Sequence, residues 1–206
     1  MKRVNPAGEE TASSCHPSWD ILILARAAYE AAVSPHYEVI LWEVAQRVDR
    51  TGSLGKTEIS ALIVWKRLSV QTRWVTSLMS LPDSDVRAVT GRAVASVRDL
   101  GVSRGEAARA GRSIISGLPG FRHGDALASA ILTAAAPQRM AVYDRHVQCA
   151  IEVLGLTLTD ESGSYGRYMA LLDALLEHSG GRAEGWRARD IDTALYWAGK
   201  NHQGKP

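Results

Sequence analysis

The amino-acid sequence predicts an all-α protein, and three observations favour this class. Apolar residues recur at the spacing of a helix face along most of the chain. The alternating pattern of a half-buried strand is nearly absent. Glycine and proline separate the periodic segments, as they do at helix ends. Together these patterns predict about nine or ten helices, with boundaries uncertain by about 2–4 residues.

The composition suits one compact domain, or two small lobes that share a cleft. The chain has 206 residues, of which 46% are hydrophobic, so it can bury a sizeable core. Its formal net charge of +2 permits a nucleic-acid partner without requiring one. Cys15 and Cys149 have neither disulfide-framework nor metal-ligand spacing, so we expect no metal, no cofactor and a cytoplasmic location. We find no signal peptide and no apolar run of membrane-spanning length.

The N-terminal part of the chain begins with a tail over residues 1–17, which carries few large apolar groups. Ser18 can cap a helix that runs to about Val33. Ser34-Pro35 interrupts it, because proline disfavours helical backbone in the preceding residue. A second helix follows over 37–50.

Helices resume after a loop, first over 56–69 and then from Trp74 to Leu81. Asp83 or Ser84 can cap the next helix, which has a regular apolar face. Gly101 ends that helix in the manner of a left-handed C-terminal glycine.

A capping box marks the start of the following helix. The Ser103 side chain can accept from the amide of Glu106, whose carboxylate can reach back. Three further helices are expected near the C-terminus, over 145–154, 165–178 and 188–198.

The stretch from Leu118 to Val147 carries most of the chemistry that the sequence offers. Leu118-Pro119-Gly120 opens a glycine turn that closes at Gly124, and an apolar helix follows over 126–136. A strand-like apolar segment over 140–143 then leads to Asp144, which lies at the start of another helix.

This turn and this aspartate each have a structural and a functional interpretation. The turn is either an ordinary helix connection or a set of amide donors for a phosphate, with Arg122 and His123 adding charge. Asp144 is either a helix cap alone or a reactive carboxylate that the helix dipole keeps ionised.

Taken together, the string LPG…ALASAIL…AVYDRHV resembles the helix–hairpin–helix DNA glycosylase superfamily. The segment ALIVWKRL…W…LMSLPDSDVRAVT also resembles the start of the helical barrel in bacterial members that are similar to 8-oxoguanine glycosylases. Leu118-Pro119-Gly120 matches the opening of the hairpin, and residues 128–132 match the helix after it. The end of the motif matches at Val142, Asp144, His146 and Val147. The order of elements fits over about residues 18–200.

The resemblance implies a two-lobed helical fold with DNA in the cleft between the lobes. One discontinuous lobe combines residues 18–44 with 139–206. The other, over 45–138, is a helical barrel that ends in the helix–hairpin–helix motif.

The resemblance also implies the roles of the central residues. Asp144 is the expected catalytic residue: it stabilises the cationic sugar as the N-glycosidic bond of a flipped base is hydrolysed. Gly120, Arg122, His123 and Gly124 are expected to bind the DNA backbone, where Arg145 can assist.

Aromatic side chains are the candidates for holding the flipped base, because bases of any kind stack on their faces. Trp42, Trp65 and Trp74 are candidates for stacking, although each is also typical of a helix core. Tyr143 and Lys66 are further candidates for lining the base pocket.

The chain departs from the superfamily pattern in three places. Its hairpin is two residues longer, and no four-cysteine cluster follows. Ala126 stands where bifunctional members carry a lysine, so we expect a monofunctional glycosylase without lyase activity. Lys66 could supply an amine from elsewhere, but the sequence does not place it.

The expected partner is double-stranded DNA that contains a damaged or modified base. We expect a monomer, associated with the nucleoid, that acts in base-excision repair or in defence against modified phage DNA. The sequence does not identify the base. Two alternatives remain open: a non-catalytic helix–hairpin–helix DNA-binding module, and a helical protein-interaction domain.

Overall fold

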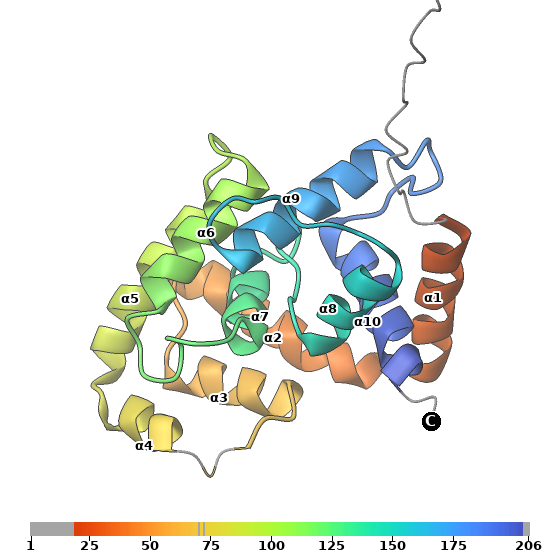
Figure 1. Ribbon diagram of the computed structural model, residues 1–206. Helices are drawn as coiled ribbons and strands as arrows, with labels where there is room; N and C mark the ends of the chain where they lie inside the picture. Colours follow the sequence, from red (N-terminus) through yellow and green to blue (C-terminus); the bar gives the residue numbers. More distant parts are fainter. Residues whose placement is uncertain (1–18, 70, 72, 204–206) are drawn as a thin grey trace, which may run out of the picture.

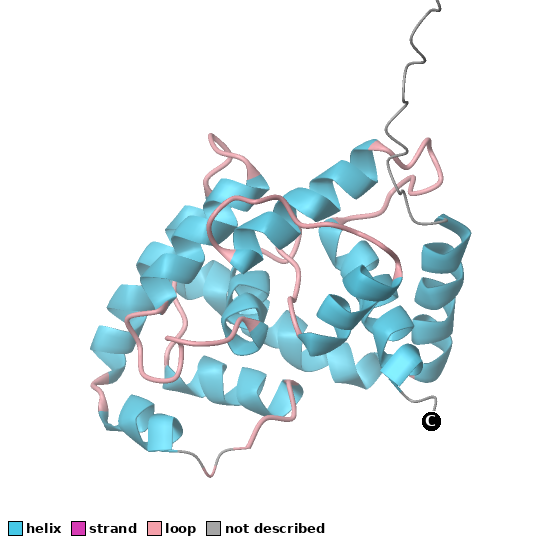
Figure 2. Ribbon diagram, viewed as in Figure 1, coloured by secondary structure: helices cyan, strands magenta, loops and turns pink. Residues whose placement is uncertain are grey.

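The computed structural model describes residues 19–69, 71 and 73–203, and all regular secondary structure in these residues is helical (Figure 2). The predicted tail and the Ser18 cap lie outside the described residues. The ten helices are α1 (Trp19–Ala32), α2 (Pro35–Thr51), α3 (Lys56–Trp65), α4 (Arg73–Ser80), α5 (Asp83–Arg98), α6 (Arg104–Ile115), α7 (Ala126–Ala135), α8 (Arg145–Val153), α9 (Ser164–Glu177) and α10 (Ala188–Gln203). The all-α prediction is confirmed.

Helix α7 lies among α2, α3, α5 and α6 (Figure 1). Every residue from Leu127 to Ala135 is buried, as expected of a helix that is hydrophobic all round. On the other side of the molecule, α10 packs against α1 and α8, and α9 packs against α6 on the α7 side (Figure 1). The buried apolar side chains form one continuous cluster. The division into two lobes stays a prediction.

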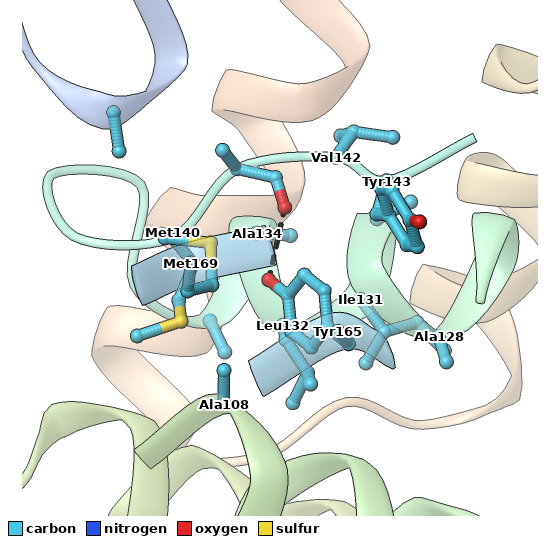
Figure 3. Packing of buried hydrophobic residues seen from close by; sticks show 14 of the residues in the cluster. Ala108, Ala128, Ile131, Leu132, Ala134, Met140, Val142, Tyr143, Tyr165 and Met169 are labelled. Carbon is cyan, nitrogen blue, oxygen red and sulfur yellow. Dashed lines mark hydrogen bonds between the residues drawn. The ribbon is translucent and has the colours of Figure 1, made fainter. Parts of the chain in front are cut away.

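The apolar lead-in over 140–143 is an extended segment buried in this core (Figure 3). Asp192 accepts from the amide of Val142 at 3.1 Å, and Ser129 accepts from the amide of Tyr143 at 2.9 Å. The Tyr165 hydroxyl donates to the carbonyl of Ala141 at 2.9 Å. Because buried peptide groups require partners, these polar side chains replace the sheet neighbours that the segment lacks.

Two helix ends differ from the prediction for identifiable reasons. Helix α2 begins at Pro35 rather than Tyr37, because Ser34 caps it and proline fits the first helical turn. Helix α3 ends at Trp65, four residues before the predicted end, because Arg67 adopts a left-handed φ of 53°. The chain therefore turns immediately after Lys66.

The predicted ends of α5 are wrong at both termini. Pro82 occupies the N-cap position, while the Asp83 carboxylate accepts from the amide of Lys56 at 2.7 Å. The helix ends at Arg98, and Gly101 is not in the left-handed region. Helix α10 runs to Gln203, five residues beyond its predicted end. The capping box at the start of α6 is confirmed.

Candidate functional site

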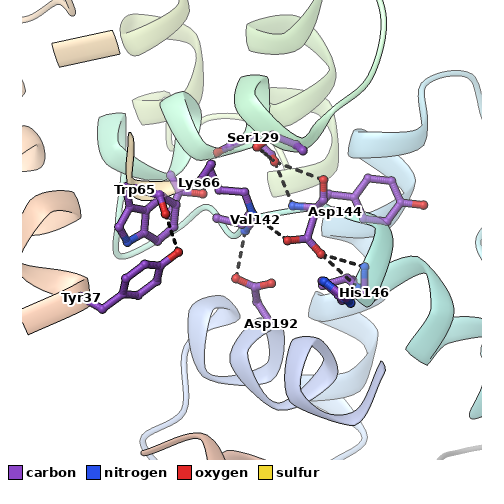
Figure 4. Close-up of polar contacts among 12 residues, drawn as sticks. Tyr37, Trp65, Lys66, Ser129, Val142, Asp144, His146 and Asp192 are labelled. Carbon is purple, nitrogen blue, oxygen red and sulfur yellow. Dashed lines mark hydrogen bonds and ion pairs between the residues drawn. The ribbon is translucent and has the colours of Figure 1, made fainter. Parts of the chain in front are cut away.

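Asp144 caps α8 with one carboxylate oxygen and contacts a lysine with the other (Figure 4). Its Oδ1 accepts from the amides of His146 at 3.0 Å and Val147 at 3.3 Å. Its Oδ2 lies 2.6 Å from Nζ of Lys66, which directly follows α3. The predicted capping role is therefore confirmed, and the carboxylate is also half of an ion pair.

This ion pair is largely shielded from solvent. The side chains of Lys66 and Asp144 are 12% and 10% exposed. Burial alone raises the pKa of the Asp144 carboxyl, but the Lys66 ammonium and the α8 amides outweigh it, so the pKa lies below its usual range. Asp144 is thus ionised at neutral pH.

The neighbouring histidine is a packed side chain. The His146 ring meets Tyr196 edge-on, with the ring centroids 5.2 Å apart. Burial lowers the His146 pKa, which keeps the ring neutral at pH 7, although Asp144 opposes this shift. Its Nδ1 is buried and has no hydrogen-bond partner among the described residues.

Asp144 and Lys66 line a small pocket between α3, α8 and α10. The other lining residues are Tyr29, Tyr37, Trp65, Val142, Arg189, Asp192, Thr193 and Tyr196. The cavity volume is about 30 Å³, which exceeds the roughly 10–15 Å³ that a water molecule needs. In this conformation the pocket accommodates a water beside the carboxylate but not a nucleobase.

Aromatic rings and a guanidinium close one wall of this pocket. Tyr37 stacks on Trp65 with centroids 5.6 Å apart, and its hydroxyl donates to the Trp65 carbonyl. The Arg189 guanidinium lies 5.5 Å from the Trp65 ring. Trp65 is only 2% exposed, and its indole N–H has no acceptor among the described residues.

A buried ion network lies beneath the pocket. Arg189 pairs with Asp192 and, at 3.0 Å, with Glu38. Asp192 also accepts from the Tyr168 hydroxyl at 3.3 Å. Burial raises the pKa of Asp192 to about 6, although Arg189 opposes this shift. These residues were not predicted, because no local motif links α2 with α10.

The structure separates two predicted base-pocket residues from Asp144. Tyr143 stacks on Tyr168, with centroids 4.7 Å apart, and does not line the pocket. It directly precedes Asp144 in extended backbone, where successive side chains point to opposite sides. Trp42 is 44% exposed on α2 and lines a separate surface groove with Leu100. Only Trp65 and Lys66 of this predicted set lie beside Asp144.

The glycine hairpin between α6 and α7 is held by Arg112, a residue that sequence reasoning missed. Its guanidinium donates to the carbonyls of Phe121 at 2.8 Å and Gly124 at 3.0 Å. It also pairs with the Asp125 carboxylate at 2.7 Å. Asp125 therefore makes no capping hydrogen bond to α7, so the first amides of that helix have no side-chain acceptor from their N-cap residue.

The tip of the hairpin faces solvent. Arg122, His123 and Gly124 are exposed, and within the described part of the chain their amides donate to no protein group. Ser129 in the first turn of α7 accepts from the Tyr143 amide, which joins the start of α7 to the start of α8 (Figure 4). The exposed Arg145 is the first residue of α8 and directly follows Asp144.

The two hairpin glycines offer a matched test of packing. Gly120 and Gly124 have φ angles of 88° and 76°. A Cβ at Gly120 would lie 2.2 Å from the Trp74 ring, whereas one at Gly124 meets nothing within 4 Å. Trp74, a predicted stacking residue, thus packs under the hairpin.

Both alanine variants incur the left-handed strain, and Gly120→Ala should be less stable than Gly124→Ala by about 1–3 kcal/mol in urea unfolding. Equal losses would show that Trp74 moves freely.

No family model, curated protein or solved structure matches this chain. Among the described residues, no three histidine, cysteine, aspartate or glutamate side chains gather as metal ligands do. No helix in the described ranges combines the length and apolar character needed to cross a bilayer.

Proposed function

We propose that this chain is a DNA glycosylase of the helix–hairpin–helix type, which hydrolyses the N-glycosidic bond of a damaged or modified base flipped out of the duplex. The observation that carries the proposal is the ionised Asp144 carboxylate, shielded from solvent beside a pocket large enough for a water.

Asp144 supplies the charge that the reaction needs. As the base departs, positive charge develops on the sugar, and a fixed carboxylate in a poorly solvated site stabilises it more than water does. The α8 amides and Lys66 fix the direction of the carboxylate. A water in the pocket lies close enough to be oriented for attack.

The hairpin supplies the anchor on the DNA backbone. Amides without acceptors at the start of a helix bind phosphate oxygens, and the Arg122 guanidinium adds a charged contact. Such contacts set the register of the protein on DNA but carry little base information. His123 and Arg145 are exposed as well.

The base enters when the aromatic wall opens. The closed pocket is too small for a base, so Tyr37 and Trp65 must move apart, after which their faces can stack on the base. The Trp65 indole N–H has no acceptor in the closed pocket and can donate to a carbonyl or ring nitrogen of the base.

Duplex DNA with a damaged or modified base is the proposed substrate, in base-excision repair or in defence against modified phage DNA. We propose that the protein acts as a monomer near the nucleoid. In the proposed fold the DNA lies between the two helical lobes.

A substrate panel tests this proposal. Duplexes that carry oxidised, alkylated or mispaired bases, together with modified phage DNAs, are incubated with the protein and scored for released base by mass spectrometry. Release from at least one substrate is expected. Salt-dependent DNA binding without any release would favour the inert binding module instead, and binding without a salt slope would favour the interaction domain.

A separate prediction concerns the contribution of the hairpin to the salt dependence of DNA binding. Arg122→Gln should lower the slope of log affinity against log salt concentration by about one, because one phosphate contact is lost. Arg182→Gln is the matched control, since Arg182 is an exposed arginine in the loop between α9 and α10. An equal loss in both variants would mean that net charge, rather than the hairpin, governs binding.

A further inference from the structure

Lys66 is one of five lysines in the chain, and its ammonium lies in the proposed catalytic pocket. The side chain is 12% exposed and Nζ lies 2.6 Å from Asp144. By contrast, Lys56 directs its ammonium to the carbonyls of Met79 and Leu81, and Lys200 lies exposed over Trp197. Of the lysines that the structure describes, Lys66 alone faces the proposed reaction centre.

We propose that Lys66 is a second catalytic residue, a nucleophilic amine that attacks C1′ of the abasic sugar and cleaves the DNA strand after base release. This inference rests on the proposed function and extends it from hydrolysis to lyase activity. Ala126 offers no amine at the start of α7, and the structure brings one to Asp144 from the end of α3 instead.

The position of Lys66 suits this chemistry. A C1′ atom close enough to Asp144 for electrostatic stabilisation also lies within reach of Nζ, because Nζ and Oδ2 are in contact. Attack requires the neutral amine, so the ammonium proton must pass to solvent water, because the ionised Asp144 carboxylate is too weak a base to hold it.

The backbone around Lys66 is held firmly. Its amide donates to Leu62, and the next two amides donate to Val64 and Ile63. This turn requires Arg67 to adopt a left-handed φ of 53°, a position usually occupied by glycine. In the closed pocket the Tyr37 hydroxyl also donates to the carbonyl of Trp65, which directly precedes the lysine.

The reaction balances with groups already present. Hydrolysis of the glycosidic bond leaves a sugar whose open form carries an aldehyde at C1′. The Lys66 amine adds to this carbon and water leaves, which gives an imine. Loss of the C2′ proton then expels the 3′ phosphate and breaks the strand. Water then hydrolyses the imine, which restores Lys66 and leaves the unsaturated aldehyde on the end of the upstream strand, still joined through its 5′ phosphate.

The test starts from a duplex with a preformed abasic site, so it does not depend on base release. The intact protein is mixed with this duplex and borohydride, which reduces the imine to a stable adduct. Peptide mass spectrometry then identifies the modified residue. We expect an adduct on Lys66 with the wild-type protein and strand cleavage when borohydride is omitted.

Two variants separate nucleophilic from structural roles. Lys66→Arg keeps a cation beside Asp144 but removes the primary amine, so it should form no adduct. Lys200→Arg should form the adduct as the wild type does, because that lysine lies outside the pocket. A urea unfolding transition like that of the wild type shows that Lys66→Arg is folded.

The outcomes distinguish the two proposals. An adduct that persists in Lys66→Arg, or that maps to another amine, overturns the role of Lys66. Base release without any adduct does the same and leaves the hydrolytic glycosylase standing. An adduct on Lys66 without base release from any substrate supports the lyase chemistry and counts against the glycosylase.

Discussion

Replacing Asp144 with asparagine is expected to slow base release by about 10²–10³-fold, the usual effect of removing one electrostatic group from a reaction centre. The two side chains have nearly the same shape, and an amide oxygen can still accept from the amides of His146 and Val147. The asparagine is neutral, so it cannot stabilise a cationic sugar or take a proton from water. The measurement is single-turnover release of the base from a substrate found in the panel.

Asp125→Asn is the matched control for this variant. Asp125 also occupies an N-cap position and pairs with an arginine, Arg112, at 2.7 Å, with its side chain 13% exposed. It lines a different pocket from Asp144. Its replacement should weaken the hairpin while leaving the chemical step within a few-fold. If Asp144→Asn releases base as fast as the wild type, Asp144 is not the catalytic residue.

Much of the helical architecture could be predicted because its causes are local. The apolar period, proline interruptions and the Ser103–Glu106 capping box each act within a few residues. The errors arose where distant contacts competed. Asp83 does not cap α5, because its carboxylate accepts from the Lys56 amide and pairs with Arg87.

The candidate site was only half visible in the sequence for the same reason. Asp144 and the hairpin belong to one contiguous stretch, so their spacing could be recognised. Lys66 is 78 residues away from Asp144, and nothing in the sequence indicates that pairing. Trp42 and Trp65 both have helical spacing, and only packing decides that Trp65 faces the pocket while Trp42 faces solvent.

Replacing Arg189 with methionine is expected to lower the free energy of unfolding by about 3–5 kcal/mol, because it removes one partner of a buried ion pair. The Asp192 side chain is only 1% exposed, so without a counterion it either carries a buried unpaired charge or takes up a proton, and both are costly. Glu38 would also lose its ion-pair partner, at 3.0 Å in the native protein, and keep the hydrogen bond from Tyr29. Urea denaturation at pH 8 measures the loss.

The double variant Arg189→Met with Asp192→Asn separates charge from packing. Asparagine can still accept from the Val142 amide, as Asp192 does at 3.1 Å, but it carries no buried charge. Most of the lost stability should therefore return.

The stability of the single variant should also depend on pH. Burial already raises the pKa of Asp192 to about 6 and Arg189 opposes the rise, so removing Arg189 raises the pKa further. A carboxyl whose pKa is raised by folding loses stability as pH increases. The loss of stability caused by Arg189→Met should accordingly grow from pH 6 to pH 8, and this growth should be absent from the double variant. A pH-independent loss would mean that the guanidinium acts through its packing on Trp65 rather than through its charge.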